Sequence, residues 1–296
     1  MKPQPPQHAV LNFIHPLARN LKGCWLFNEG RGHKLFGTDG FVHDYSGNQA
    51  HIGLGDFQHN PWVHEEWGYS FVFNPNPHPK WGEEQWGTSH WTVSGADTSV
   101  PLMVGDIHEY TNNFTVACYY FRLEEDRNQR VIDRILNRFP LSPIPNYSLI
   151  HNSSNQTHFF MGNVLLSNGV IEAPLNEWIA TVATLSDTSS HLYINGEEVD
   201  SNGGAQATPT PGASLVFGGS YNEGEDVVGD IFSGKLGLIA IWDRPLLQHE
   251  VQKFPFGLFD AFDYCIIPAF LSGDTEGLAG LPKQLFSYRQ RRVGVI

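Results

Sequence analysis

At 296 residues the chain can bury a large core, and its length lies within the range of a single all-β sandwich. The net charge of −13 excludes a typical nucleic-acid-binding body, and no apolar stretch is long enough to span a membrane or to form the centre of a signal peptide. We therefore expect a protein that is made in a reducing cytosol and that binds neither nucleic acid nor membrane.

Turn-forming residues recur along the whole chain, and its 30 glycines and 19 prolines favour many short strands over helices. Pro3, Pro5 and Pro6 forbid a helix near the start, and His15-Pro16 disfavours one further on. We predict an extended N-terminal arm over residues 1–20. β-branched and aromatic runs then predict strands at 21–28, 35–42, 50–54, 69–73, 98–104, 114–123, 131–137, 147–152, 158–161, 164–167, 178–185, 214–218 and 235–242.

A segment rich in Pro, Gly and Trp interrupts this series of strands over residues 74–95. Trp81, Trp86 and Trp91 are spaced five residues apart in it, and tryptophan offers a large apolar contact with one polar edge. The segment could contact a partner, including the rings of a sugar, or it could fold back as a small core over the rest of the domain. The sequence leaves both alternatives open.

The stretch from Trp178 to Asp200 predicts two consecutive hairpins. It turns at Asn195-Gly196, the strongest short hairpin signal. A two-residue loop there places Ile194 opposite Glu197 and Leu192 opposite Val199. One face of the hairpin is then apolar, and the other face is expected to be wet and carries His191, Tyr193, Glu198 and Asp200.

The apolar face of such a hairpin needs a second layer to cover it. Helical periodicity is weak in this chain, so the second layer is expected to be another sheet. We predict an all-β, two-sheet antiparallel sandwich over residues 21–254. One helix is expected from Arg244-Pro245 to Phe254, with Leu247, Val251 and Phe254 spaced along one face and Pro255 at its end.

Charge is distributed unevenly along the chain. Residues 283–296 contain four basic residues and no acid, which leaves residues 1–282 with a net charge of −17. The extension over residues 255–296 is also more apolar than disordered segments usually are. The two ends could dock on the acidic body of a neighbouring copy or of another protein, or they could be solvated tails. The candidate docking residues are Arg289, Arg291 and Arg292.

Three motifs occur in a fixed order: residues 23–32 with 44–48, then Trp178 through Asn195-Gly196-Glu197, then residues 234–246. In this combination the chain resembles the laminin-G-like, concanavalin A-like jelly roll. The resemblance implies two antiparallel sheets of six or seven strands, with the first and last strands paired. It covers about residues 21–254.

Two flanking segments, His15-Pro16-Leu17-Ala18 and Phe254 to Phe259, resemble the versions of this domain found in tailed-bacteriophage structural proteins. This second resemblance implies a non-enzymatic virion component, made in the host cytoplasm, such as a capsid decoration or a tail-associated subunit. Its partners would be copies of itself and other virion proteins. A carbohydrate-binding adhesion module is the alternative function, and a glycoside hydrolase of the same fold is a second alternative.

Some laminin-G-like domains hold a calcium ion near the turn that corresponds to residues 44–48. Asp44, Asn48 and Glu29 offer suitable oxygen ligands here, although Asp and Asn also serve turns without any metal. No cofactor is expected otherwise. The segment Glu124 to Gln129 is the nearest match to the carboxylate motif of glycoside hydrolases, but the carboxamide of Gln129 cannot supply a proton. We expect no catalysis there.

Overall fold

The computed structural model describes residues 4–5, 9–28, 40–55, 62–73, 102–104, 113–123, 128–136, 144–154, 156–161, 164–172, 174–203, 214–222, 227–230 and 232–264. The chain divides into two units, Met1–Tyr264 and Cys265–Ile296, and every described residue lies in the first. The C-terminal extension is predicted to begin at residue 255. The first unit continues to Tyr264 because residues 256–264 form a helix and a strand that belong to it.

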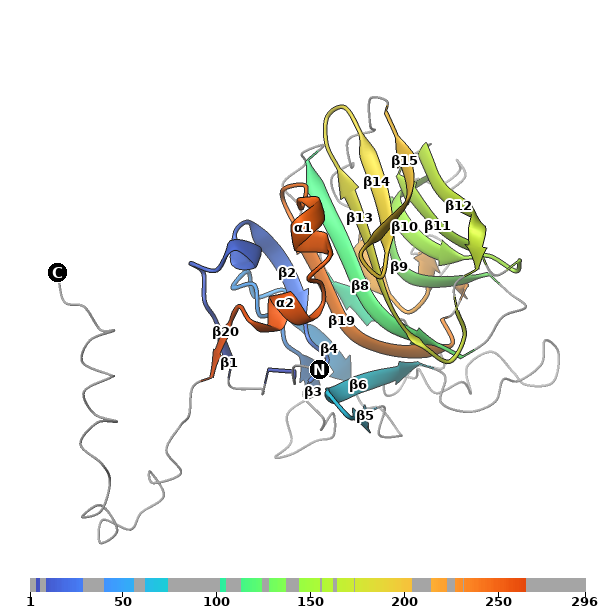
Figure 1. Ribbon diagram of the computed structural model, residues 1–296. Coiled ribbons are helices and arrows are strands. Elements are labelled where there is room, and N and C mark those ends of the chain that lie inside the picture. The colour runs from blue at the N-terminus through green and yellow to red at the C-terminus, as the bar shows by residue number, and fades with distance from the viewer. Residues whose placement is uncertain are drawn as a thin grey trace, which may run out of the picture. The chain divides into compact units, whose positions relative to one another are not determined.

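The described residues are mostly strands that form two facing antiparallel sheets (Figure 1). The large sheet has the order β15-β14-β13-β8-β19-β6-β5, with β2 also paired to β19, and the second sheet has the order β12-β11-β10-β9-β16-β7. The large sheet contains β2 (Leu21–Trp25), β5 (Trp62–Glu65), β6 (Gly68–Phe73), β8 (Phe114–Arg122), β13 (Trp178–Leu185), β14 (Ser190–Ile194), β15 (Glu197–Asn202) and β19 (Gly234–Trp242). The second sheet contains β7 (Leu102–Val104), β9 (Gln129–Leu136), β10 (Ile144–His151), β11 (Gln156–Met161), β12 (Val164–Glu172) and β16 (Ser214–Phe217). The predicted sandwich is confirmed.

Three two-stranded ribbons and three short helices complete the described part of the chain. The ribbons are β1 (Ala9–Leu11) with β20 (Phe262–Tyr264), β3 (Gly40–Val42) with β4 (Ile52–Gly55), and β17 (Ser220–Asn222) with β18 (Val227–Gly229). The helices are η1 (Pro16–Ala18), α1 (Gln248–Val251) and α2 (Phe256–Phe259). None of the helices in the described residues is long and apolar enough to cross a membrane.

The pairing of the first and last strands of the sandwich, which the jelly-roll resemblance implies, is present. Strand β2 pairs antiparallel with the C-terminal half of β19, and Trp25 lies opposite Ile239. The space between the two sheets is filled by large apolar side chains, among which Trp25, Phe71 and Phe217 are fully buried. Burial of this inner core is the main stabilising contribution to the fold.

The hairpin prediction is correct at the turn and wrong beyond it. Strand β13 has the predicted bounds, and Ile194 pairs with Glu197 across Asn195-Gly196. An irregularity between Leu192 and Tyr193 then shifts the register, so that Leu192 pairs with Asp200 and not with Val199. A bulge of this kind inserts one residue into one strand only, and the turn sequence carries no signal for it.

The expectation of a wet outer face on the large sheet is also wrong. Tyr193 is only 5% exposed, and it belongs to a second apolar cluster on the outer face together with Ala117, Val182 and Leu238. The residues that cover this face come from both flanking segments: Ala9, Leu11, Leu17 and Ala18 on the N-terminal side, and Leu246, Val251, Phe254, Leu258, Phe259, Ala261 and Phe262 on the C-terminal side.

Residues 9–20, predicted as part of an extended arm, are therefore folded onto the sheet of their own chain. Their contacts include the indole Nε1 of Trp242, which donates to the carbonyl oxygen of Leu17 at 2.7 Å. Gln4 lies further back in the chain and is also buried, with its Oε1 accepting a hydrogen bond from the backbone N–H of Tyr69 at 2.7 Å. Strand β1 pairs with β20, so both flanks of the domain meet in one ribbon.

The predicted helix is shorter than its sequence pattern indicates. Within residues 244–254 only Gln248–Val251 is helical, and Leu247 takes the N-cap position with extended backbone angles. Leu247 is 59% exposed, whereas Val251 and Phe254 are buried. The Leu247 side chain therefore does not belong to the buried face.

Candidate functional site

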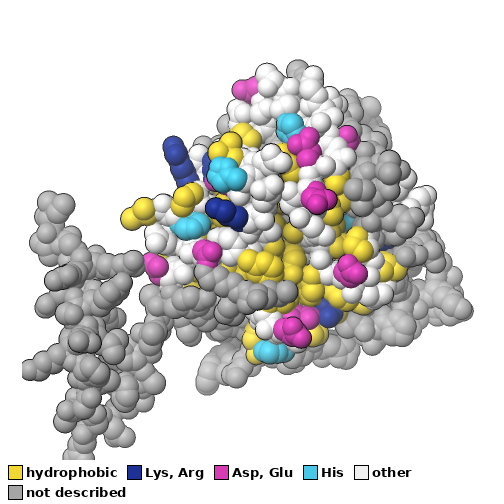
Figure 2. Space-filling view, in the orientation of Figure 1, with side chains coloured by type: hydrophobic (Ala, Val, Ile, Leu, Met, Phe, Trp, Pro, Cys, Tyr) yellow, Lys and Arg dark blue, Asp and Glu magenta, His cyan; other side chains and the backbone are white. Residues whose placement is uncertain are grey.

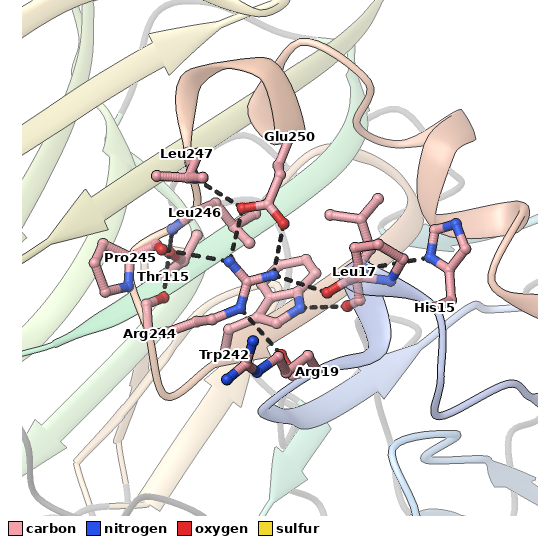
Figure 3. A network of polar contacts seen from close by, with 11 residues as sticks. His15, Leu17, Arg19, Thr115, Trp242, Arg244, Pro245, Leu246, Leu247 and Glu250 are labelled. Carbon is pink, nitrogen blue, oxygen red and sulfur yellow. Dashed lines mark hydrogen bonds and ion pairs between the residues drawn. The ribbon is translucent and has the colours of Figure 1, made fainter.

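The two flanking segments are joined by a network of polar contacts centred on Arg244 (Figure 3). The Arg244 guanidinium forms a two-pronged ion pair with the carboxylate of Glu250, at 2.7 and 2.8 Å. It also donates to the backbone carbonyl oxygens of Pro16 at 3.0 Å and Arg19 at 3.1 Å. Glu250 in turn accepts from the backbone N–H of Leu247 and so caps α1. We call Arg244 and Glu250 the flank latch, because they connect α1 to the N-terminal segment.

The pKa of Glu250 is lowered even though its partial burial raises it, because the Arg244 side chain and the Leu247 N–H both stabilise the ionised carboxylate. Thr115 on β8 completes the attachment: its hydroxyl donates to the carbonyl oxygen of Arg244 and accepts from the N–H of Leu246. All these groups are engaged with one another. The latch therefore has a structural role, which is to hold the cover on the outer face of the large sheet.

An aromatic cluster on the outer face combines the buried rings of Trp67 and Tyr119 with half-buried rings at its edge. Trp178 on β13 stacks on Tyr119 of β8 with ring centroids 4.8 Å apart, and the edge of Trp67 meets Trp178 at 4.9 Å. Phe121 and Phe256 extend the cluster, at 5.7 Å from Trp178 and 5.8 Å from Tyr119 respectively. Hydrophobic side chains gather in the middle of this face in Figure 2.

Strand register explains how these side chains come together. Trp178 lies opposite Phe121, Phe121 opposite Lys235 and Lys235 opposite Val72, so that one row crosses β13, β8, β19 and β6. Trp178, Phe121 and Lys235 are each half-buried, and Val72 is 8% exposed. The row therefore presents aromatic and aliphatic surface with one cation in it.

Gly237 allows the tryptophans to approach the sheet. A Cβ atom at this position would lie 2.6 Å from Cη2 of Trp67 and 3.0 Å from Cζ3 of Trp178. The register of β19 against β8 also shifts at this point, between Leu236 and Leu238. A glycine within a strand commonly marks a bulge or a close approach, and here it marks both.

An ion pair lies beside the aromatic cluster. The ammonium of Lys235 lies 4.6 Å from the ring centroid of Phe121 and 2.8 Å from Oε1 of Glu65, which also accepts from the hydroxyl of Ser70 at 3.1 Å. Burial and then the charge of Glu65 raise the pKa of Tyr119 to about 12, so its hydroxyl is protonated at neutral pH. The surface thus combines aromatic rings with groups that can form hydrogen bonds.

The candidate calcium turn is saturated by protein donors. Oδ1 of Asp44 accepts from the N–H groups of Cys24 and Ser46, and Oδ2 accepts from the Ser46 hydroxyl and the Ala50 N–H, all within 2.8–3.1 Å. Asn48 donates through its amide to the carbonyl oxygen of Lys22. These contacts fit the turn alternative, in which the side chains bond the backbone of their own turn. Glu29 lies outside the described residues, among which no cluster of three metal-binding side chains occurs.

Gln129, from the hydrolase-like segment, is fully buried, and its Oε1 accepts a hydrogen bond from the N–H of Ser233 at 3.0 Å. Its position is therefore structural. It lies opposite His151, and the hydroxyl of Thr157 lies 3.3 Å from Nδ1 of His151. Burial, and then the charges of Arg122 and His158, lower the pKa of His151, which is neutral at pH 7.

A buried acid occupies the second sheet. Asp133 on β9 accepts from Arg130 at 2.9 Å, and Arg130 also pairs with Asp230 at 2.8 Å. Burial raises the pKa of Asp133 to about 6, although Arg130 and Ser148 both act to lower it. Through its ion pair with Asp230, Arg130 joins β9 to the residue after β18.

The other candidates from the sequence cannot be placed. Trp81, Trp86 and Trp91 lie outside the described residues, as do Arg289, Arg291 and Arg292 and the segment 124–127. The aromatic cluster, in contrast, was missed. The strands that carry it were predicted one by one, but their order in the sheet, which brings Trp178, Phe121 and Lys235 into one row, was not.

A two-sheet antiparallel sandwich whose first and last strands pair defines the jelly-roll class. A sequence model of the concanavalin A-like lectin/glucanases superfamily matches residues 94–252, which is more than half of the chain. The chain belongs to this superfamily.

Solved structures show the same fold at low sequence identity. The binding domain of Paraclostridial Mosquitocidal Protein 1 matches with a TM-score of 0.52 and 14% identity over 83% of this chain and 53% of that one. A mutant of Trypanosoma rangeli sialidase displaying trans-sialidase activity matches with a TM-score of 0.50 and 11% identity, over 82% of this chain and 35% of the sialidase. The chain thus spans about a third of the sialidase and about half of the mosquitocidal binding domain. No curated protein matches.

Proposed function

We propose that this chain is a non-enzymatic virion structural protein, either a capsid decoration or a tail-associated subunit, that works through surface contact. The observation that carries the proposal concerns the two segments that resemble phage versions of the domain. Leu17 and the first residues of α2 lie together, since a Cβ at Gly257 would be 3.4 Å from Cδ1 of Leu17. Both flanks are thus integral parts of this domain: Leu17 lies beside α2, and the flank latch ties α1 to the N-terminal flank.

The proposal includes the terminal segments as attachment sites. Arg289, Arg291 and Arg292 belong to a basic segment that would dock on an acidic neighbour, either another copy of the chain or another virion protein. Such steering depends on ionic strength, so attachment should weaken as salt is raised.

The test uses tailed-phage particles purified on a density gradient and probed with an antibody raised against the full chain. The proposal expects the protein to co-sediment with particles and expects the triple variant R289A/R291A/R292A to reduce its attachment. Lys253, an exposed cation of the sandwich domain, provides the matched control as Lys253→Ala. If the protein were found only in the soluble fraction, the virion role would be excluded.

A carbohydrate-binding adhesion module is the second candidate, and the aromatic cluster is the observation that favours it. Trp178 and Phe121 are half-buried rings beside Lys235 and Glu65, and rings next to hydrogen-bonding groups suit the binding of sugars. A glycan array should compare the wild type with Trp178→Ala and with the variants Trp81→Ala, Trp86→Ala and Trp91→Ala. A signal lost only in Trp178→Ala would assign binding to the cluster. If no variant reduced a wild-type signal, neither tryptophan group would be the binding site.

A glycoside hydrolase remains the third alternative, and its test is direct. Glu124→Gln should abolish any polysaccharide cleavage if the segment 124–129 were catalytic. The structural position of Gln129 supports the non-enzymatic proposal, since its carboxamide oxygen bonds the backbone N–H of Ser233.

A further inference from the structure

A glutamine near the start of the chain is buried in the large sheet. Gln4 is only 8% exposed, and its carboxamide bonds backbone groups that are far apart in the sequence. Oε1 accepts from the N–H of Tyr69 at 2.7 Å, and Nε2 donates to the carbonyl oxygen of Leu26 and, at 3.4 Å, to that of Gly237. Tyr69 lies in β6, Leu26 directly follows β2, and Gly237 lies in β19. One side chain therefore uses both its acceptor and its donor group to join three places in the sheet.

The backbone around this side chain is held as well. The N–H of Gln4 donates to the carbonyl oxygen of Trp67 at 2.5 Å, and the carbonyl oxygen of Pro5 accepts from the amide of Asn28 at 2.7 Å. The N–H and Oε1 of Gln4 thus bond the two residues that flank Gly68, at the turn between β5 and β6. We call Gln4 and Pro5 the N-terminal strap.

The strap and the aromatic cluster share one closely packed site. A Cβ at Gly68 would lie 2.3 Å from Oε1 of Gln4, so only glycine leaves room for the strap there. Gly237 accepts a hydrogen bond from the strap, and it is also the position where a Cβ would lie 2.6 Å from the ring of Trp67. Close approach of another group is a common reason for a glycine within a strand. Here two groups approach the same glycine.

Trp67 connects the strap to the surface of the cluster. Gln4 holds its backbone carbonyl, and its ring meets the ring of Trp178 with centroids 4.9 Å apart and planes at 86°. Trp67 is 4% exposed, whereas Trp178 is half-buried. Trp67 can therefore influence a ligand only through the exposed ring that it supports.

We propose that Gln4 is a positioning residue of the aromatic cluster: the strap fixes Trp67, and Trp67 fixes the orientation of Trp178 at the surface. This inference rests on the second candidate function, in which Trp178 binds a sugar. A ring that is already held in place loses little freedom when a ligand binds. Loss of the carboxamide leaves the N–H of Tyr69 and the carbonyl oxygen of Leu26 without this partner, so the turn that carries Trp67 should shift.

The first experiment measures the circular dichroism of the Trp67 and Trp178 indoles in the full-length chain. Two indole rings this close and nearly perpendicular couple electronically and give a pair of bands of opposite sign. Subtracting the spectrum of Trp67→Phe isolates this band pair from the other tryptophans. Gln4→Ala should reduce its amplitude at least twofold. Gln248→Ala is the matched control, because Gln248 is exposed on α1, and it should leave the band pair unchanged.

Gln4→Glu separates the hydrogen bonds of Gln4 from its size. The ionised carboxylate keeps an acceptor for the N–H of Tyr69, but it turns a second oxygen toward the carbonyl oxygens of Leu26 and Gly237. The protonated carboxyl group supplies one donor instead. Relative to the wild type at the same pH, the band pair of Gln4→Glu should be weak at neutral pH. It should recover as the pH is lowered toward the ordinary pKa of glutamate, about 4.3. Gln248→Glu should match the wild type at every pH.

Glycan binding provides the functional measurement. For a glycan whose signal is lost in Trp178→Ala, Gln4→Ala should weaken binding at least tenfold. An unchanged band pair in Gln4→Ala overturns the positioning role, and so does a band pair of Gln4→Glu that does not respond to pH. Wild-type glycan affinity in a Gln4→Ala protein that has lost its band pair also overturns it. A wild type that binds no glycan, with a band pair that still depends on Gln4, would exclude the carbohydrate function and support the hold of the strap on Trp67.

Discussion

The flank latch makes a quantitative prediction about the cover on the large sheet. Replacing Arg244 with Ala removes two charged hydrogen bonds to Glu250 and those to the carbonyls of Pro16 and Arg19. It also leaves the Glu250 carboxylate, whose side chain is 9% exposed, without its partner. Arg244→Ala should therefore detach α1 from the N-terminal segment and lower the free energy of unfolding.

The expected magnitude follows from the burial of the pair. Removing one partner of a fully buried ion pair costs about 3–5 kcal/mol. The Arg244 side chain is 18% exposed, and water will compensate part of the loss, so we expect about 2–4 kcal/mol. At about 2–4 °C per kcal/mol for a domain of this size, the Tm should fall by about 4–16 °C. Arg244→Lys should show roughly half of this loss, since an ammonium cannot form the two-pronged contact.

Thermal unfolding and hydrogen–deuterium exchange of residues 9–20 check the prediction together. Both Arg244 variants should exchange faster in that segment at temperatures well below the Tm, because the segment opens locally once the latch is broken. Arg19→Ala is the control, since the side chain of Arg19 is exposed and only its carbonyl oxygen contributes to the latch. Wild-type stability and wild-type exchange in Arg244→Lys would refute the latch.

Three further changes test other parts of the fold. Asp44→Ala should lower the free energy of unfolding, measured by chemical denaturation, by about 3 kcal/mol or more, because four hydrogen-bond donors lose their acceptor. Because these donors occupy the carboxylate, EDTA should leave the Tm of the wild type unchanged. Gly218→Ala should prevent soluble expression, since φ is +78° and the new Cβ would lie 2.0 Å from Phe73. Below pH 6.5 the free energy of unfolding of the wild type should fall by about 1.4 kcal/mol per pH unit relative to that of His151→Gln. The reason is that His151 is neutral in the folded protein and binds a proton when the protein unfolds. Equal slopes for the wild type and His151→Gln would contradict that origin.

The pH prediction compares the wild type with His151→Gln because the contribution of Asp133 to stability changes with pH in the direction opposite to that of His151. Its pKa is raised to about 6 in the fold, so between its unfolded value near 3.8 and pH 6 the folded protein binds the extra proton. Stability contributed by Asp133 is therefore present at low pH and lost as the pH rises through 6. Comparing the wild type with His151→Gln cancels this contribution, since Asp133 is present in both.

Local sequence signals predicted every strand of the two sheets except β5, because each strand depends mainly on its own residues, but they missed β1, β17, β18 and β20 of the short ribbons. Trp178–Leu185 was predicted to the residue, and the Asn195-Gly196 turn correctly paired Ile194 with Glu197. Prediction failed where a distant part of the chain decides the outcome. Tyr193 was expected on a wet face because the hairpin alone cannot show that residues 9–18 and 246–262 return to cover it.

The flanking segments were misread for a related reason. The prolines near the N-terminus disfavour a regular helix there, but an extended backbone is not necessarily an unattached one. Leu17 and Trp242 are 225 residues apart, and no local pattern links the carbonyl of one to the indole of the other. Composition alone could have indicated that the C-terminal flank packs on the domain, because residues 254–262 contain too many aromatic and aliphatic side chains to remain in water.

The aromatic cluster shows what kind of signal could have located the candidate site. Trp178, Phe121 and Lys235 come from three strands far apart in the chain, and their alignment in one row requires the strand order β13-β8-β19. Gly237 is the local exception, since it interrupts the apolar strand 234–242 where packing would favour a side chain. The close approach of Trp67 and Trp178 accounts for it. Gly237→Ala should therefore displace both rings, and tryptophan fluorescence should change even if the sandwich stays folded.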